Sequence, residues 1–326
     1  MTDAPPEQPT AISAVVIGRN EGTRLLACLT SLQPQVQRLI YVDSGSSDGS
    51  VAAARSLGVE VVALDMTRPF TAARARNAGL AELSTQEGFV QLVDGDCEVD
   101  AAWIPQAAEF LRQNPRVAVV CGRRRERFPE ASIYNQICDA EWDTPIGEAL
   151  ACGGDALMRL SALRAVSGYR EDLIAGEEPE LCLRLRREGW KIWRLEAEMT
   201  LHDAQMTRFR QWWIRSRRAG YAFAAGAALH GKAQERHWVK ETRRAVLWGM
   251  VLPGSALLLA MLFSPWALLL LLLYPLQLLR LSPRLGLRPA LFSILGKLAE
   301  STGIAEHFWH RLHGTHRKIM EYKQPR

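Results

Sequence analysis

The sequence predicts an α/β fold with a doubly wound, mostly parallel sheet, followed by C-terminal helices that associate with a membrane. Short, mainly apolar runs alternate with segments of helical periodicity over residues 11–204, as βαβ units do. Such runs are typical of strands that are covered on both faces of a sheet. Residues 245–279 contain no charged side chain, and one membrane-spanning helix needs ~20 apolar residues.

The elements of the sheet follow in order after residues 1–10, a proline-rich segment that we expect to be a disordered lead. The expected strands are residues 11–18, 38–43, 59–64, 89–94 and 117–122. The expected helices are residues 24–32, 50–57, 71–83 and 102–113. Residues 123–204 are less periodic, with helices near 161–166 and 176–187 and short strands at 191–194 and 199–201.

The two parts of the chain carry opposite charge. Residues 1–204 hold 21 Lys and Arg against 30 Asp and Glu, whereas residues 205–326 hold 19 against 5. A basic tail indicates nucleic acid or a membrane surface as partner, and the apolar run excludes nucleic acid in favour of membrane lipids. We see no secretory signal before the first strand, so we expect a cytoplasmic domain whose six scattered cysteines are reduced.

Polar clusters lie at the carboxyl ends of three expected strands, at residues 19–21, 43–48 and 94–96. Ligands bind beyond these ends in doubly wound sheets. Asp94 and Asp96 are one residue apart after an apolar strand, so both carboxylates point to the same side. Carboxylate oxygens suit Mg²⁺ or Mn²⁺, ions that usually keep substrate phosphates as further ligands.

Five segments in order carry a resemblance to a known family: SAVVIGRNEG, VDSGSSDGS, ARARNAGL, VDGD and GEEPELCLRL. Together they resemble the family 2 glycosyltransferases of the membrane-anchored bacterial type, which have the GT-A fold, over about residues 11–215. The resemblance implies an inverting transfer of a sugar from a nucleoside-diphosphate sugar, of the UDP or GDP type. It also implies Mn²⁺ or Mg²⁺ as cofactor.

The resemblance implies a role for each motif residue on the donor side. Asp43 matches the acid that contacts the nucleotide base, with Ser44 and Asp48 in the same loop. Arg76 and Asn77 match nucleotide-sugar contacts. The remaining donor contacts that we expect are Arg19, Glu21, Asp94 and Gly95.

The same motifs imply the metal and acceptor sides of the site. Asp96 matches the metal ligand, with Asp94 near the ribose and the ion, and His202 resembles a histidine that completes the site in some members. Glu178 matches the catalytic base, although Glu177 beside it leaves the choice of acid open. The other residues that we expect near the acceptor are Asp155, Glu177, Trp213 and Arg215.

The residues alone support the same chemistry and also allow plainer interpretations. A divalent ion neutralises a leaving diphosphate, and a carboxylate takes the proton of an acceptor hydroxyl. Clustered acids raise one another's pKa, which suits a base near neutral pH. However, Asp43 and Asp48 also suit helix caps, and Glu178 before Pro179 suits the first turn of a helix. His202 and Asp155 remain divided between functional and structural roles.

The basic and aromatic segment 208–218, RFRQWWIRSRR, begins the C-terminal part. Trp and Arg together suit a membrane interface. Basic residues flank the apolar run on both sides, which places both ends in the cytoplasm and requires an even number of crossings. Ser264 and Pro265 interrupt the run, so we expect a hairpin of roughly residues 245–263 and 266–280, either transmembrane or re-entrant.

We therefore expect five segments. These are the lead at 1–10, a GT-A catalytic domain at 11–204, interfacial helices at 205–244, the hairpin at 245–280, and an interfacial helix with a basic cytoplasmic tail at 281–326. The expected function is glycosyl transfer at a bacterial inner membrane to a lipid-linked or glycan acceptor. The alternatives are a scaffold that binds anionic lipid and a sugar-nucleotidyltransferase, although Gly18–Gly22 poorly fits the Gly-, Arg- and Lys-rich loop of the latter.

Overall fold

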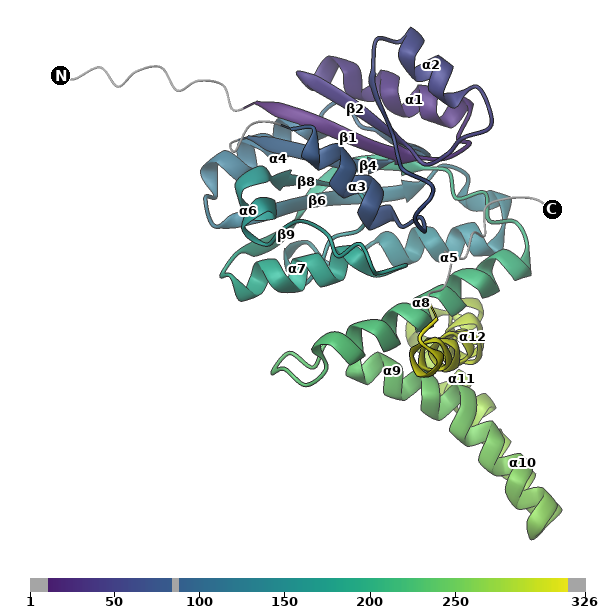
Figure 1. Cartoon of the computed structure of the whole chain (residues 1–326). Helices are drawn as coiled ribbons and strands as arrows, with labels where there is room; N and C mark the ends of the chain where they lie inside the picture. The colour runs from purple at the N-terminus through teal and green to yellow at the C-terminus, as the bar shows by residue number, and fades with distance from the viewer. Residues whose placement is uncertain (1–10, 84–87, 316–326) are drawn as a thin grey trace. The chain divides into compact units, whose positions relative to one another are not determined.

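The computed structural model describes residues 11–83 and 88–315, and the expected lead and the last residues of the basic tail lie outside these ranges. The chain forms two compact units (Figure 1). The N-terminal unit contains residues up to 172 together with 177–205, and the C-terminal unit contains 173–176 and the residues from 206 onward.

A single mixed sheet forms the centre of the N-terminal unit (Figure 1). Its strand order is β3-β2-β1-β4-β8-β6-β9-β5, and β7 also pairs with β9. The strands are β1 Ile12–Gly18, β2 Arg38–Asp43, β3 Glu60–Ala63, β4 Phe89–Asp94, β5 Cys97–Val99, β6 Val117–Glu126, β7 Gly147–Ala149, β8 Ala156–Arg159 and β9 Lys191–His202.

The sheet is parallel across β3, β2, β1 and β4, as the sequence predicts. Beyond β4 the sheet is mixed, because β6 pairs parallel with β9 but the shorter strands run the other way. There β8 runs antiparallel to both β4 and β6, and β5 and β7 run antiparallel to β9. The difference arises because β5, β7 and β8 are strands of three or four residues, too short for a period-2 pattern to reveal them.

Seven helices of the N-terminal unit connect these strands. They are α1 Thr23–Leu32, α2 Ser50–Ser56, α3 Ala72–Ala81, α4 Trp103–Gln113, α5 Ile133–Trp142, α6 Leu160–Ala165 and α7 Glu177–Arg187. The first four agree with the expected helices to within two residues. The sequence did not predict α5, whose N-cap hydroxyl on Ser132 accepts from the backbone N–H of Asn135 at 3.0 Å.

Strand register brings the candidate loops to one edge of the sheet. Gly18 at the end of β1 pairs with Asp43 at the end of β2, and Ile17 pairs with Asp94 at the end of β4. Residues of β1 and β4 are buried at nearly every position, which anchors the strands that carry these ends. The polar loops after them therefore open beside one another, as expected for the carboxyl ends of parallel strands.

The C-terminal unit is helical. Its helices are α8 Phe209–His230, α9 Val239–Val246, α10 Leu252–Leu262, α11 Leu273–Leu285 and α12 Leu287–His313, with a π-helical turn at Leu247–Val251 and a 3-10 helix at Pro265–Leu272. Small residues allow α8 and α12 to pack closely. A Cβ on Gly303 would lie 1.9 Å from the carbonyl oxygen of Arg217, and one on Gly220 would lie 2.0 Å from that of Glu300.

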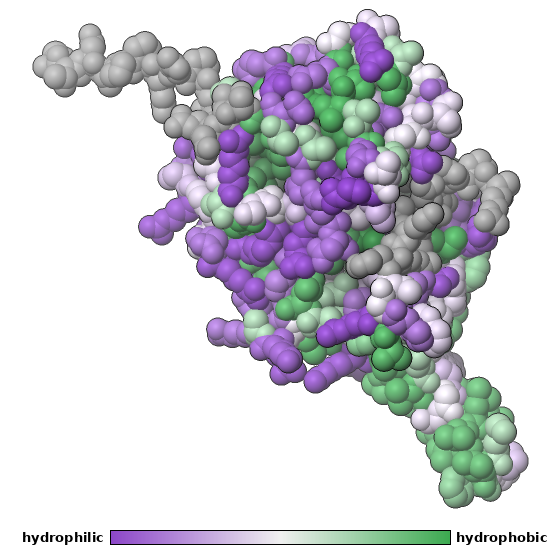
Figure 2. Space-filling model, viewed as in Figure 1, coloured by the Kyte–Doolittle hydropathy of each residue, from purple (hydrophilic) through white to green (hydrophobic). Residues whose placement is uncertain are grey.

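The apolar run forms two helical segments long enough to cross a membrane, Val239–Leu262 and Pro265–Leu285. The chain turns between them at Ser264, whose hydroxyl caps the second segment, so the break falls where the sequence predicts it. Both segments are longer than expected because basic residues at their outer ends continue the helices. Figure 2 shows hydrophobic side chains over the protruding end of this hairpin, where Met261, Phe263 and Trp266 are exposed.

Candidate active site

The Asp43 carboxylate organises the loop after β2. One oxygen accepts the backbone N–H groups of Gly45 and Ser46, each at 3.0 Å, and the other accepts the Tyr41 hydroxyl at 2.9 Å. Asp43 is buried. It therefore holds the loop in shape from inside, and any contact with a nucleotide base would add to this structural role.

Asn20 joins the loop after β1 to the loop after β2. Its side-chain oxygen accepts hydrogen bonds from the backbone N–H groups of Ser47 at 2.7 Å and Asp48 at 3.3 Å. The backbone N–H of Asn20 donates to the Ser46 hydroxyl at 2.9 Å. The backbone of Asn20 is left-handed, with φ 55°, a conformation that Asn tolerates better than most residues. The sequence analysis did not single out Asn20, although it lies in a predicted turn.

These loops contain other residues that we expected to contact the nucleotide sugar, and they lie in different environments. Arg19 is exposed, and Glu21 forms an ion pair with Arg24 at 2.7 Å. Asp48 accepts the N–H of Ser50, the first residue of α2, but the N-cap residue is Gly49, and among the described residues no side chain caps the helix. Ser44 is only 1% exposed, and its expected contact with the donor stays a prediction.

Arg76 ties together three acids that are distant in sequence. Its buried guanidinium lies 2.9 Å from Asp94 Oδ1, 3.0 Å from Glu177 Oε1 and 2.9 Å from Glu178 Oε1. It thus links α3, the end of β4 and the start of α7. Arg76 is 2% exposed, so it does not belong to a solvated helix face.

Arg124 on β6 forms a second bridge on the other side of Asp94. Its guanidinium lies 3.2 Å from Asp94 Oδ2 and 2.8 Å from Asp155 Oδ2, and it stacks over the Trp142 ring at 5.3 Å. This residue was not predicted. It lies in the run RRRER, where nothing local distinguishes it from the solvent-exposed Arg125.

Asp155 and Asn77, which we expected to contact ligands, form hydrogen bonds that hold other parts of the protein in position. Asp155 is fully buried, where it accepts the Thr200 hydroxyl at 2.8 Å and the backbone N–H of Asp94 at 3.2 Å. It therefore cannot reach an acceptor, and that interpretation is wrong. Asn77 exchanges hydrogen bonds with the backbone of Tyr169, at 2.8 and 2.9 Å. Its amide braces the loop after α6 instead of facing Asp94.

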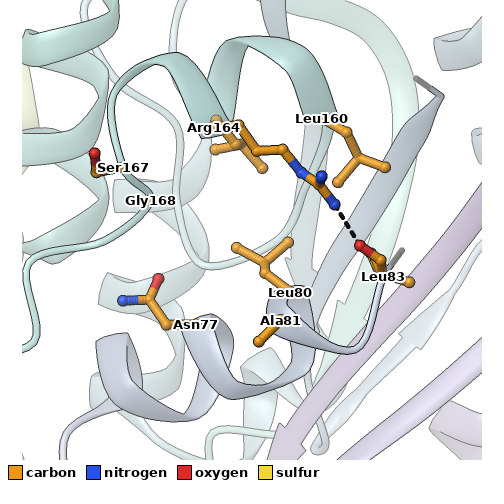
Figure 3. A pocket seen from close by; sticks show the side chains of 9 residues that line it. Asn77, Leu80, Ala81, Leu83, Leu160, Arg164, Ser167 and Gly168 are labelled. Atoms are coloured by element: carbon orange, nitrogen blue, oxygen red, sulfur yellow. Dashed lines mark hydrogen bonds between the residues drawn. The ribbon is translucent and has the colours of Figure 1, made fainter. Parts of the chain in front are cut away.

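Asn77 also lines a pocket of about 500 Å³ between α3 and α6. Figure 3 shows Leu80, Leu160 and the Arg164 guanidinium around it, with Arg164 donating to the carbonyl of Leu83. The lining is mainly apolar and contains none of the carboxylates that Arg76 binds. This pocket is thus separate from the charged cluster.

Asp96 and His202 meet on the far side of the Asp94 turn. His202 Nε2 lies 3.3 Å from Asp96 Oδ2, and the Cys97 thiol belongs to the same group, in which all potential ligand atoms lie within 4.8 Å of one another. Donor atoms around a first-row divalent ion lie about 3–4 Å apart, because its ligand distances are about 2.0–2.3 Å. The 3.3 Å between Asp96 Oδ2 and His202 Nε2 fits such an ion, and the 4.8 Å limit places the Cys97 thiol next to this pair.

Glu126 on β6 faces the other nitrogen of the same histidine, with 3.6 Å between Glu126 Oε2 and His202 Nδ1. Burial lowers the pKa of His202, and the nearby Arg124 guanidinium adds to this effect. The imidazole is therefore neutral at physiological pH, the form that binds metals. A carboxylate behind a ligating histidine fixes the orientation of its ring.

The three acids at the start of α7 differ in their partners. Glu180 is buried and bound by Arg184, and the Glu177 side chain is 4% exposed beside Arg76. The Glu178 side chain is 15% exposed, so it is the one that solvent reaches most easily. Burial, followed by the neighbouring Glu177 charge, raises the pKa of Glu178 to about 7 against the opposing effect of Arg76.

Trp213 and Arg215, which we expected near the acceptor, lie on α8 in the C-terminal unit. Trp213 is half-buried against Phe209, with 5.8 Å between the ring centroids. Gly95, the last of the expected donor residues, donates its N–H to the carbonyl of Ile17 at 2.8 Å and so closes the turn between Asp94 and Asp96.

Residues 13–161 match the sequence profile of the family described as Glycosyl transferase family 2. The succinoglycan biosynthesis protein ExoA of Rhizobium meliloti is 28% identical over 190 residues, which are 53% of this chain and 57% of that protein. A pre-mycofactocin glycosyltransferase of Mycobacterium tuberculosis is 27% identical over 250 residues, which are 69% of this chain and 50% of that protein. The chain spans about half the length of these curated relatives.

Among solved structures, the mannosyltransferase PcManGT from Pyrobaculum calidifontis, in complex with GDP-Man and Mn²⁺, has a TM-score of 0.65 with this chain. The likeness covers 93% of this chain and 88% of that chain, at 19% sequence identity. The predicted GT-A fold is therefore confirmed.

Gly154 provides a test of the charged cluster. A Cβ there would lie 2.8 Å from Asp94 Oδ2 and 2.9 Å from Arg76 Nη2. Gly154→Ala should force this ion pair apart and lower the free energy of unfolding by roughly 1–3 kcal/mol, the usual cost of overpacking. Urea unfolding in detergent would measure it. Gly153→Ala is the matched control, because its Cβ would meet nothing within 4 Å. Equal losses in the two variants would contradict the close packing.

Proposed function

We propose that the chain, whose residues 13–161 match the profile of glycosyl transferase family 2, transfers a sugar from a nucleoside-diphosphate sugar to a membrane-associated acceptor, with inversion at the anomeric carbon. One observation carries the proposal. Arg76 joins the half-exposed Asp94 to Glu178, the acid with the raised pKa, beside the Asp96–His202 pair. A phosphate-binding metal site and a base therefore share one edge of the sheet.

The donor side uses the loops after β1, β2 and β4. Asp43 and the loop that it shapes receive the nucleotide base, and Asp94 faces the ribose and the diphosphate. Asp96 and His202 hold the divalent ion, which neutralises the leaving diphosphate when bound. A UDP or GDP sugar suits this arrangement, and the complex of PcManGT with GDP-Man and Mn²⁺ is consistent with it.

Glu178 acts as the general base on the acceptor hydroxyl. A base works best when its pKa lies near the working pH, and that of Glu178 is raised to about 7. Arg76 holds the Glu178 carboxylate in place and also forms ion pairs with Glu177 and Asp94. One base on the face opposite the leaving group gives in-line displacement, and hence inversion. Glu177 and Glu180 are more buried than Glu178, which supports this choice.

The acceptor is a lipid-linked or membrane-proximal sugar. Two apolar helical segments long enough to span a membrane follow the N-terminal unit. Basic residues lie at their outer ends, with Arg243 and Arg244 in the first segment, Arg284 in the second, and Arg288 after it, which favours cytoplasmic ends on both sides. The N-terminal unit then works at the cytoplasmic face of a bacterial inner membrane, where its tether raises the local concentration of membrane-bound acceptors.

The donor site predicts a metal-dependent stabilisation by nucleotide. UDP or GDP with Mn²⁺ should raise the melting temperature of the detergent-solubilised protein, because ligands that bind only the folded state stabilise it. The shift should disappear in Asp96→Asn and with a chelator. Asp100→Asn is the control, because the exposed Asp100 accepts the N–H of Ala102 just before α4 and an asparagine oxygen can accept the same bond. The scaffold alternative gains support if the folded parent shows no shift with any nucleotide.

The base predicts a pH profile. Glu178 must be ionised to accept a proton, so the rate should rise as the pH passes through about 7 and fall below it. Glu178→Gln should lower kcat at least about 100-fold, keep the nucleotide-induced thermal shift, and remove this pH dependence. Turnover assays from pH 5 to 9 would measure it. Normal turnover by Glu178→Gln would remove the assignment.

The tether predicts an acceptor preference. The full chain in lipid nanodiscs should turn over a polyprenyl-linked sugar with kcat/KM at least about tenfold above that of the same sugar free in solution, because effective concentrations at a membrane are high. A radiolabelled donor would measure both reactions. Equal kcat/KM values would contradict the membrane acceptor without affecting the donor site.

A further inference from the structure

The pairing of β5 with β9 places a cysteine beside the candidate metal ligands. Cys97 and His202 are directly opposite each other in this antiparallel ladder. Opposite residues project to the same face, with Cβ atoms about 4.5–5.5 Å apart. The register therefore brings the Cys97 thiol to the face on which His202 meets Asp96.

The distances agree with this placement. Cys97 Sγ lies 3.7 Å from Asp96 Oδ1, and the ligand atoms of Cys97, Asp96 and His202 all lie within 4.8 Å of one another. All three residues are buried. Resting on the proposed function, we propose that Cys97 Sγ is a third protein ligand of the divalent ion, and that it makes the site prefer thiophilic ions over Mg²⁺.

The surrounding charges favour such a site. Arg124 Nη2 lies 3.4 Å from Cys97 Sγ, and this guanidinium also binds Asp94 and Asp155. The acids Asp94, Asp96, Asp155 and Glu126 outnumber the two arginines of this cluster, Arg124 and Arg76, so the cluster attracts a divalent cation, while Arg124 offsets part of the charge on a thiolate. As the sulfur–metal bond forms, the thiol proton leaves to solvent.

The donor set then decides which ions bind well. One oxygen, one nitrogen and one sulfur suit Zn²⁺ and Co²⁺, whereas Mg²⁺ takes oxygen ligands almost exclusively. Mn²⁺ lies between these extremes. A serine at position 97 would supply only a neutral oxygen in place of sulfur and would remove this preference.

The test is a Co²⁺ titration of the full chain in detergent, with UDP or GDP present, followed by absorption spectroscopy. The parent should show visible d–d bands and a near-ultraviolet sulfur-to-cobalt charge-transfer band. Cys97→Ser and Cys97→Ala should lose the charge-transfer band and weaken Co²⁺ binding by at least about tenfold, since even outer-shell changes cost that much. Their Mg²⁺ affinity should change little. Cys121→Ser is the matched control, because the buried Cys121 thiol faces the carbonyl of Trp193.

The outcomes separate the two proposals. If the folded parent shows d–d bands without a sulfur band, Cys97 is not a ligand, while the Asp96–His202 metal site stands. A Mg²⁺ affinity equal to that for Co²⁺ in the parent would also overturn the preference. If neither Co²⁺ nor Mn²⁺ binds with any nucleotide, both the cysteine ligand and the proposed metal site fail.

Discussion

The site depends on one buried guanidinium. Arg76 is 2% exposed and lies within 3.0 Å of carboxylate oxygens on Asp94, Glu177 and Glu178. A buried cation of this kind is stable only when it is paired, and so are the acids around it, because removal of one partner leaves an uncompensated charge. α3, the end of β4 and the start of α7 must therefore come together in one arrangement. The donor side and the base of the proposed enzyme are held by the same group, so the geometry of one cannot change without affecting the other.

Arg124 extends this charge network to the other half of the sheet. It binds the second oxygen of Asp94 and the buried Asp155, which in turn accepts the backbone N–H of Asp94. Asp94 is thus fixed by two arginines and by its own backbone, which makes the turn to Asp96 rigid. This preorganisation matters for catalysis, because groups that already stand where charge develops need no rearrangement during the reaction. The predicted rate and metal effects all depend on this fixed turn.

The sequence was a good guide to one half of the fold and a poor one to the other. The strands β1, β2 and β4 are apolar runs whose polar ends mark the site, so Asp43, Asp94 and Asp96 could be found from local pattern alone. Arg124, Glu126 and Cys97 could not, because their roles depend on the pairing of β5, β6 and β9 across about a hundred residues. Strand register is set by the tertiary structure, and a period-2 pattern in three residues does not reveal it. His202 lies between these cases. Its residue type suggested a metal ligand, but its neighbours Cys97 and Glu126 are set by the pairing of β9 with β5 and β6.

Some motif residues of this site can face a ligand, and others hold those residues in position. Asn77 is hydrogen-bonded to the backbone of Tyr169. Asp155 is hydrogen-bonded to Thr200 and to the backbone of Asp94, and Ser44 is buried. Of the three acids that Arg76 joins, Asp94 at 31% and Glu178 at 15% keep more exposed side-chain surface than Glu177 at 4%. A motif match names the positions that build such a site. Burial and hydrogen bonding then distinguish the side chains that hold the site in shape from those that stay open to solvent.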